Sequence, residues 1–60
     1  MTGREVRQVR KRLGLTQREF ATRVGVTPNA VAKWESGHFT VGKTAAILIR
    51  LLDPRRKEGQ

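Results

Sequence analysis

The 60-residue sequence contains no cysteine and a single histidine. Without cysteine it can form neither a disulfide framework nor a thiolate metal site, and one histidine supplies too few ligands for structural zinc. We therefore expect no metal and no cofactor. No apolar run approaches the length of a membrane span, and residues 1–4 do not open a signal peptide. These absences predict a soluble, cytoplasmic protein.

Acidic residues are also scarce, since thirteen Lys and Arg stand against five Asp and Glu, which gives a net charge of +8. Residues 1–52 hold ten of these bases and three of these acids, so +7 belongs to the domain rather than to the tail. Such a basic domain favours a polyanionic partner, most often nucleic acid. The alternative is a surface that charge merely keeps soluble.

The sequence lacks the residue sets that catalysis requires. It shows no paired carboxylates, no Ser/His/Asp arrangement and no metal-ligand cluster. Ser36 and His38 are close in sequence, but no orienting acid or oxyanion site accompanies them. We therefore expect no catalytic residues and no enzyme. The bases are spread over several helices rather than along one face, which also argues against a membrane-surface peptide.

Helix-capping signals divide the chain into four segments and no strand alternation appears, so we predict an all-α fold. The first two segments open with capping boxes, and the third opens with a threonine followed by proline at the first helical position. Glycine ends each of these three segments. The predicted helices lie between Thr2 and Gly14, Thr16 and Gly25, Thr27 and Gly37, and from Gly42 to Leu52.

Only Gly25, Val26 and Thr27 separate the second segment from the third, so the two helices must meet at a sharp angle. This is the helix-turn-helix arrangement, whose turn often contains glycine. Gly25 suits a left-handed backbone. Ala21 would let the two helices approach closely, and three valines would fill the space under the turn: Val24, Val26 and Val31.

On a helical wheel of the third segment, Val31 and Trp34 point one way and the polar side chains point the other. The outward face combines Asn29, Lys33 and Ser36 with the small Ala32. Such a short-armed polar face can enter a DNA major groove, where backbone must approach the base edges. An ordinary amphipathic helix is the alternative for this segment taken alone.

The pattern Leu15-Thr16-Gln17-x-Glu19-Phe20-Ala21-x-x-x-Gly25-Val26-Thr27-x-x-x-Val31-x-x-Trp34-Glu35-x-Gly37 resembles the phage repressor and Cro family of helix-turn-helix proteins. The resemblance covers residues 4–52. It implies a compact domain of four or five helices, the lambda-repressor-like fold, that binds operator DNA as a dimer. It also implies that Gln17 contacts the DNA backbone and can orient the third helix.

The resemblance further implies that residues of the third helix face DNA. The predicted base contacts are Asn29 and Lys33, with Ala30 and Pro28 beside them. Relatives often carry a groove-reading polar residue where this chain has Pro28, so one expected contact is missing and the target sequence cannot be borrowed. The predicted phosphate contacts are at helix starts, in the following loop or at the rim of this surface: Gln17, Thr27, Arg18, Ser36, Thr40 and Lys43.

Arg10 lies on the same side of the first helix as the apolar Val9 and Leu13. Because an unpaired buried charge is costly, we expect a partner, and Glu35 beside the buried side of the third helix is the candidate. The family resemblance agrees with this ion pair. The alternative is that Arg10 extends its charged end to solvent.

The fourth segment is apolar almost all round, and so small a domain cannot cover it fully. We expect Leu48 and Leu52 to face the core, while Ile47 and Leu51 point away and form a homodimer interface. The predicted organisation is a DNA-binding domain over residues 1–53 and a poorly ordered basic tail over residues 54–60.

Together these features predict a sequence-specific, double-stranded-DNA-binding regulator of bacterial or phage origin, located at the nucleoid. Its most direct action would be repression, as a homodimer on a palindromic operator. The alternative is the antitoxin of a toxin–antitoxin pair, which binds its own promoter and a toxin protein. A neighbouring gene for a small toxin would distinguish the two.

Overall fold

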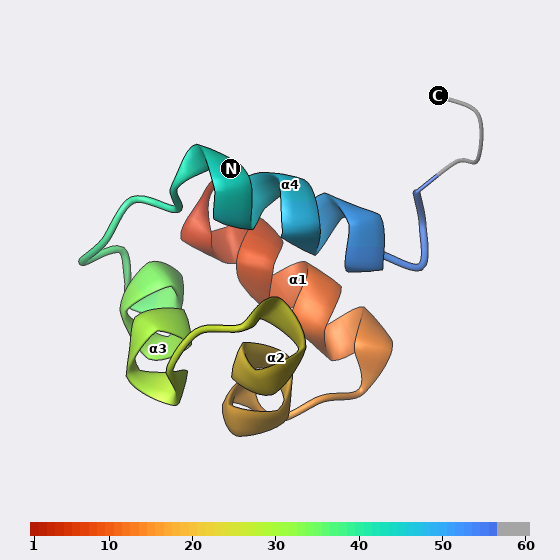
Figure 1. Cartoon of the computed structure of the whole chain (residues 1–60), viewed down its shortest axis with the longest axis horizontal. Coiled ribbons are helices and arrows are strands. Elements are labelled where there is room, and N and C mark those ends of the chain that lie inside the picture. Colours follow the sequence, from red (N-terminus) through yellow and green to blue (C-terminus); the bar gives the residue numbers. More distant parts are fainter. Residues whose placement is uncertain (57–60) are drawn as a thin grey trace.

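The computed structural model describes residues 1–56 of the chain. Within that range it has four α-helices and no strand: α1 (Gly3–Leu13), α2 (Gln17–Val24), α3 (Pro28–Ser36) and α4 (Lys43–Leu52). In Figure 1, α1 lies between α4 and the α2–α3 pair. The predicted compact all-α domain with a helix-turn-helix is thereby confirmed.

The first three helices begin where the capping signals predicted. Thr2 and Thr16 each form a complete capping box with the glutamate three residues later. At α2, the Thr16 hydroxyl accepts the Glu19 amide proton at 3.1 Å, and the Thr16 amide donates to the Glu19 carboxylate at 2.9 Å. At α3, the Thr27 hydroxyl accepts the Ala30 amide proton at 3.2 Å. Such a threonine cap typically stabilises a helix by about 1 kcal/mol.

The turn between α2 and α3 depends on Gly25, whose φ of 86° lies in the left-handed region that side chains disfavour. The amides of Gly25 and Val26 both donate to the Ala21 carbonyl, at 2.8 and 2.9 Å. Ala21 itself is buried under the turn. The short link and the small buried side chain together hold α3 tightly against α2.

The core is built from all four helices and the loop before α4. Phe20, Val6, Val31 and Ile49 are its largest fully buried side chains. The remaining buried apolar residues are Val9, Ala21, Val24, Trp34, Val41 and Ala46. Because α3 contributes Val31 and Trp34 to this core, its opposite face is left for solvent.

Helix α4 presents a different face to the core from the one predicted. The prediction for Leu48 is wrong, because its side chain is 41% exposed while Ile49 is fully buried and Ala46 nearly so. Leu52 is half-buried against the core, as expected. Because α4 has almost no polar face, a helical wheel does not show which of its sides faces the core. The rotation of α4 about its axis is determined by tertiary packing. Ile47 and Leu51 are exposed, at 49% and 55%.

Two close contacts join elements that are distant in sequence. A Cβ added at Gly3 would collide with the carbonyl oxygen of Trp34, so the start of α1 packs directly against the backbone of α3. At the other end of α1, Arg12 forms an ion pair of 3.2 Å with Asp53, just after α4. Both contacts fix α1 relative to its neighbours.

The predicted tail is described only in part. The Asp53 carboxylate and carbonyl accept the amides of Arg55 and Arg56 at 3.0 and 3.1 Å, which makes a turn after α4. Residues 57–60 lie outside the described residues. Among residues 1–56, no helix is both long and apolar enough to cross a membrane.

Candidate nucleic-acid interface

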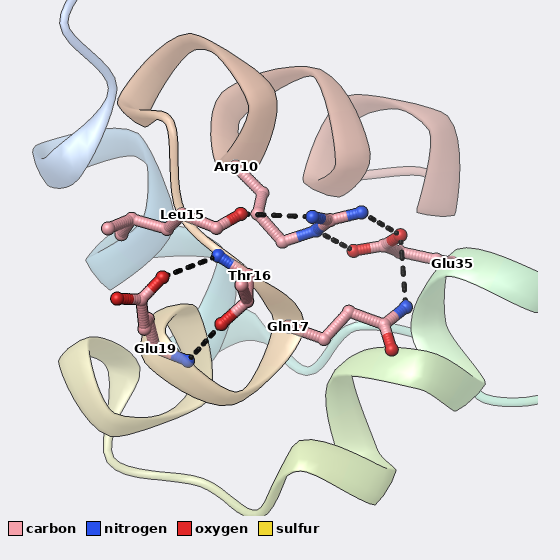
Figure 2. Close-up of polar contacts among 6 residues, drawn as sticks. All are labelled: Arg10, Leu15, Thr16, Gln17, Glu19 and Glu35. Carbon is pink, nitrogen blue, oxygen red and sulfur yellow. Dashed lines mark hydrogen bonds and ion pairs between the residues drawn. The ribbon is translucent and has the colours of Figure 1, made fainter.

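Arg10 and Glu35, the residues predicted from the sequence to pair, meet between α1 and α3 (Figure 2). The Arg10 Nε donates to Glu35 Oε2 at 2.7 Å and its Nη2 donates to Oε1 at 3.0 Å. Two parallel bonds of this kind fix orientation as well as distance. The side chains are only 11% and 7% exposed. The pair therefore fixes the orientation of α3 relative to α1.

Two further hydrogen bonds extend this ion pair to the α1–α2 link and to α2; their partners were not predicted, although the family resemblance implied that Gln17 can orient the third helix. The Arg10 Nη1 donates to the Leu15 carbonyl at 3.0 Å, which anchors the link between α1 and α2. The Gln17 Nε2 donates to Glu35 Oε1 at 3.3 Å, so the first residue of α2 is bonded to α3. In residues 1–56, no buried side-chain nitrogen or oxygen lacks a hydrogen-bond partner. We call Arg10, Leu15, Gln17 and Glu35 the polar hub.

Both charges of the polar hub are stabilised in the folded chain. Burial of Glu35 by itself would raise its pKa, but hydrogen bonds from Arg10 and Gln17 and the attraction of Arg10 and Arg7 lower the pKa below its usual value. The hydrogen bond to Glu35 raises the pKa of Arg10, against the opposing effect of burial. The side chains of Arg10 and Glu35 are therefore both charged at neutral pH.

With its buried side held by the polar hub, α3 turns a short polar face to solvent. Asn29 and Pro28 are exposed, while Ala30 and Lys33 are half-buried. Asn29 and Lys33 are four residues apart and so lie on one side of the helix, one turn apart. All four candidates for base contact lie in α3, between its first residue, Pro28, and Lys33.

Most of the candidates for phosphate contact are exposed to solvent. These are Thr27, Arg18, Thr40 and Lys43, while Gln17 is half-buried in the polar hub. The Thr27 hydroxyl caps α3 by accepting a proton, so its own proton stays free to donate to an anion. The amide group of Gln17 has a second N–H beyond the one that Glu35 accepts. These groups have the donors that a phosphate oxygen requires.

Ser36 differs from the other phosphate candidates because its single proton has internal partners. Its hydroxyl lies 3.2 Å from the Lys33 carbonyl and 2.7 Å from the His38 Nδ1. A phosphate would have to compete with these partners for that proton. His38 is an exposed loop residue, as predicted.

A contact between Lys33 and Phe39 was missed by the sequence reasoning. The Lys33 Nζ lies 5.0 Å from the centre of the Phe39 ring, in the loop after α3. A spacing of six residues across a helix end gives no periodic signal. The contact places an exposed aromatic ring beside one of the two polar candidates for base recognition.

This arrangement defines a class of protein, the helix-turn-helix domain. The second helix of the motif, α3, is held at a fixed angle and its polar face is exposed. A family model described as Helix-turn-helix matches residues 6–53 of the chain. The chain belongs to this family, in its Cro and repressor branch. No curated protein and no solved structure gave a match.

Membership of this family settles the broad activity. The chain is a DNA-binding transcriptional regulator, and its partner is double-stranded DNA. The family is one of DNA-binding regulators rather than of enzymes. In residues 1–56, no group of three or more His, Asp or Glu side chains is placed to hold a metal ion.

Proposed function

We propose that the chain is a sequence-specific repressor that binds a palindromic operator as a homodimer. The observation that carries the proposal is the polar hub, which holds α3 by its buried side, while the exposed Asn29 and the half-buried Lys33 make none of the hub's hydrogen bonds. A recognition helix must be rigid before it binds if its side chains are to meet base edges with hydrogen-bond accuracy. Repression then follows from occupation of the promoter, which blocks RNA polymerase.

Asn29 and Lys33 carry the proposed base recognition. An asparagine amide fits adenine, since it accepts from N6 and donates to N7, while lysine fits the two acceptors of guanine. Ala30 adds a methyl group that suits the thymine methyl. Pro28 has no amide proton and offers only an apolar ring. We therefore expect each half-site to be defined by few base pairs.

The proposed phosphate contacts position α3 in the groove. Gln17 and Thr27 stand at the starts of α2 and α3, where free amides and the helix dipole favour an anion. Arg18, Thr40 and Lys43 add charge and donors around them, and Ser36 is the weakest member of the set. Such contacts fix the register on DNA without reading sequence.

The proposed homodimer forms through α4. Ile47, Leu48 and Leu51 form one exposed apolar stripe, with exposed fractions of 49%, 41% and 55%. A second copy of the same stripe would cover it, and two α3 helices about 34 Å apart would then enter successive major grooves. The same stripe suits a toxin protein, which keeps the antitoxin function as the second candidate.

Selection of bound sequences from random duplex DNA tests the proposal. We expect an enriched site with two inverted half-sites whose centres are about 10 base pairs apart. Asn29→Ala and Lys33→Ala should each relax preference at one or two base pairs and cost about 1–3 kcal/mol on the selected site. Lys43→Ala, the matched control at the rim, should weaken all sequences alike and lower the salt slope by about one.

Two results would overturn parts of this proposal. If Asn29→Ala and Lys33→Ala both keep the wild-type sequence preference, the assigned base contacts are wrong. If the chain sediments as a monomer at high concentration and selects a single asymmetric site, the homodimer is wrong. Co-purification of a stoichiometric toxin bound over Ile47 and Leu51 would favour the second candidate.

A further inference from the structure

Phe39 has an unusual position for an aromatic residue of this chain. The sequence has two phenylalanines, one tryptophan and no tyrosine. Phe20 and Trp34 are core residues, whereas Phe39 is 53% exposed and lies in the loop between α3 and α4. Single exposed apolar side chains are common and need no function. What distinguishes Phe39 is the group that it contacts.

The contact of Phe39 is with Lys33, the proposed guanine-reading residue. Its ring centre is 5.0 Å from the Lys33 Nζ, within the range of about 6 Å over which a ring attracts a cation. Lys33 is half-buried, so its long stem lies along the protein rather than free in solvent. The ring is thus a neighbour that attracts the ammonium group of Lys33.

Main-chain hydrogen bonds hold the loop that carries Phe39 against the end of α3. The Lys33 carbonyl accepts the amides of Gly37, His38 and Phe39, the last two at 2.9 and 3.2 Å. Gly37 makes this possible with a left-handed φ of 84°. Three amides on one carbonyl fold the loop back onto the residue whose side chain the ring contacts. The placement of the ring therefore follows from the helix end and not from burial in the core.

We propose that Phe39 is a positioning residue for DNA recognition, whose ring holds the Lys33 ammonium in place to read its base pair. This inference rests on the proposed function. The ring takes up one side of the ammonium and leaves N–H donors on the other for the acceptors of guanine. A lysine held in this way loses less rotamer freedom on binding and is less free to move to a nearby phosphate. Phe39 thus raises sequence preference more than it raises total affinity.

Chemical synthesis of the full 60-residue chain with fluorinated phenylalanines at position 39 tests this directly. One, two and three fluorines withdraw electron density from the ring face stepwise and leave its shape almost unchanged. The preference at the base pair that Lys33→Ala relaxes should fall stepwise, by roughly two- to fivefold in total, as for an exposed cation–π contact. The salt slope should stay at its wild-type value, because no charge changes. The thermal midpoint should fall by only a few degrees, because an exposed cation–π contact is weak.

Conventional variants give the matched controls. Phe39→Tyr keeps the ring and should keep the preference, whereas Phe39→Leu keeps apolar bulk and should lose it. In a Lys33→Ala background, Phe39→Leu should have no further effect on preference. The fluorine series remains decisive if the leucine variant folds poorly.

The outcomes separate this inference from the function on which it rests. If the wild type prefers an operator and Lys33→Ala relaxes it, but the fluorine series is flat, Phe39 does not position Lys33. An equal loss from Phe39→Leu with and without Lys33 would also overturn the inference, since the ring would then act independently. A wild-type chain without sequence preference would overturn the proposed function as well.

Discussion

Helices α3 and α4 have nearly the same length, nine and ten residues, but they are held by different means. Thr27 caps α3 with a side-chain hydrogen bond, Gly37 closes it, and Glu35 bonds it to both α1 and α2. The start of α4 at Gly42 has no side-chain cap bond, and its apolar stripe over Ile47, Leu48 and Leu51 remains exposed. Directional bonds therefore fix α3 within one chain. Among residues 1–56, helix α4 has only the Arg12–Asp53 ion pair at its end and otherwise relies on apolar burial, which leaves part of its apolar surface exposed.

The largest effect on stability is expected when the guanidinium of Arg10, which bonds α1 to α3, is removed. Arg10→Met should destabilise the fold by about 3 kcal/mol, because the Glu35 carboxylate stays buried without its ionic partner. The Leu15 carbonyl loses its donor as well. Urea denaturation followed by circular dichroism measures the loss.

The controls for Arg10 separate charge from bulk. Lys11→Met removes an exposed charge from the same helix and should change stability by less than about 0.5 kcal/mol. Arg10→Met combined with Glu35→Leu should recover much of the loss, since no unpaired charge remains buried. Equal stability of Arg10→Met and wild type would show that the polar hub does not hold α3.

A second change tests the steric part of the attachment of α3. Gly3→Ala introduces a Cβ where the Trp34 carbonyl already lies, so α1 and α3 must separate. Overpacking of this kind costs about 1–3 kcal/mol, although alanine is otherwise the better helix former. The thermal midpoint measures it. Gly42→Ala is the steric control, because nothing lies within 4 Å of its added Cβ, and it carries only the cost of replacing glycine at the start of α4. If both variants melt alike, the close packing at Gly3 contributes nothing.

Acid should weaken the attachment of α3 to α1 and α2. The pKa of Glu35 is lowered in the folded state, so its contribution is fully present above the unfolded-state glutamate pKa of about 4.3. That contribution is lost as pH falls through the lower folded-state value. The pKa of Glu19, lowered chiefly by the Thr16 backbone and side-chain hydrogen bonds, behaves in the same way. Denaturation midpoints between pH 6 and pH 2 should fall, and Glu35→Gln should flatten part of that slope.

The smallest effect on folding is expected in α4. Ile47→Glu or Leu51→Glu should change the stability of the monomer by less than about 0.5 kcal/mol, because both side chains are already largely exposed. Their effect should instead appear as loss of self-association in sedimentation. Thr44→Glu adds the same charge to an exposed position of the same helix and serves as control. A variant that unfolds, or one that still dimerises, would contradict the proposed role of the stripe.

The sequence predicted what depends on neighbouring residues. The caps at Thr2, Thr16 and Thr27 and the glycine at the α2–α3 turn are signals within four residues of the structure they determine. The apolar positions of α1 to α3 followed from helical period, since each of these helices also has a polar face. Arg10 was conspicuous because a charge on an apolar face requires a partner.

What depends on tertiary placement was not predictable in the same way. Helix α4 lacks a polar face, so nothing in its sequence distinguished Ile49 from Leu48 as the core residue. The collision at Gly3 involves a backbone atom 31 residues later, which no side-chain pattern reports. The bond from Gln17 to Glu35 arises only once α2 and α3 have packed, and the contact of Lys33 with Phe39 crosses a helix end, where no periodic signal marks it.

The polar hub and the outward face of α3 share no side chain. Glu35 serves the hub, while the side chains of Pro28, Asn29 and Ala30 make none of its hydrogen bonds. Under the proposed function, a mutation at positions 28 to 30 would therefore change the base sequence that is recognised and leave the hydrogen bonds of the polar hub intact. The proposed function then makes the chain suitable for retargeting, because a new operator would need substitutions on one face of α3 while the contacts that hold the helix stay unchanged.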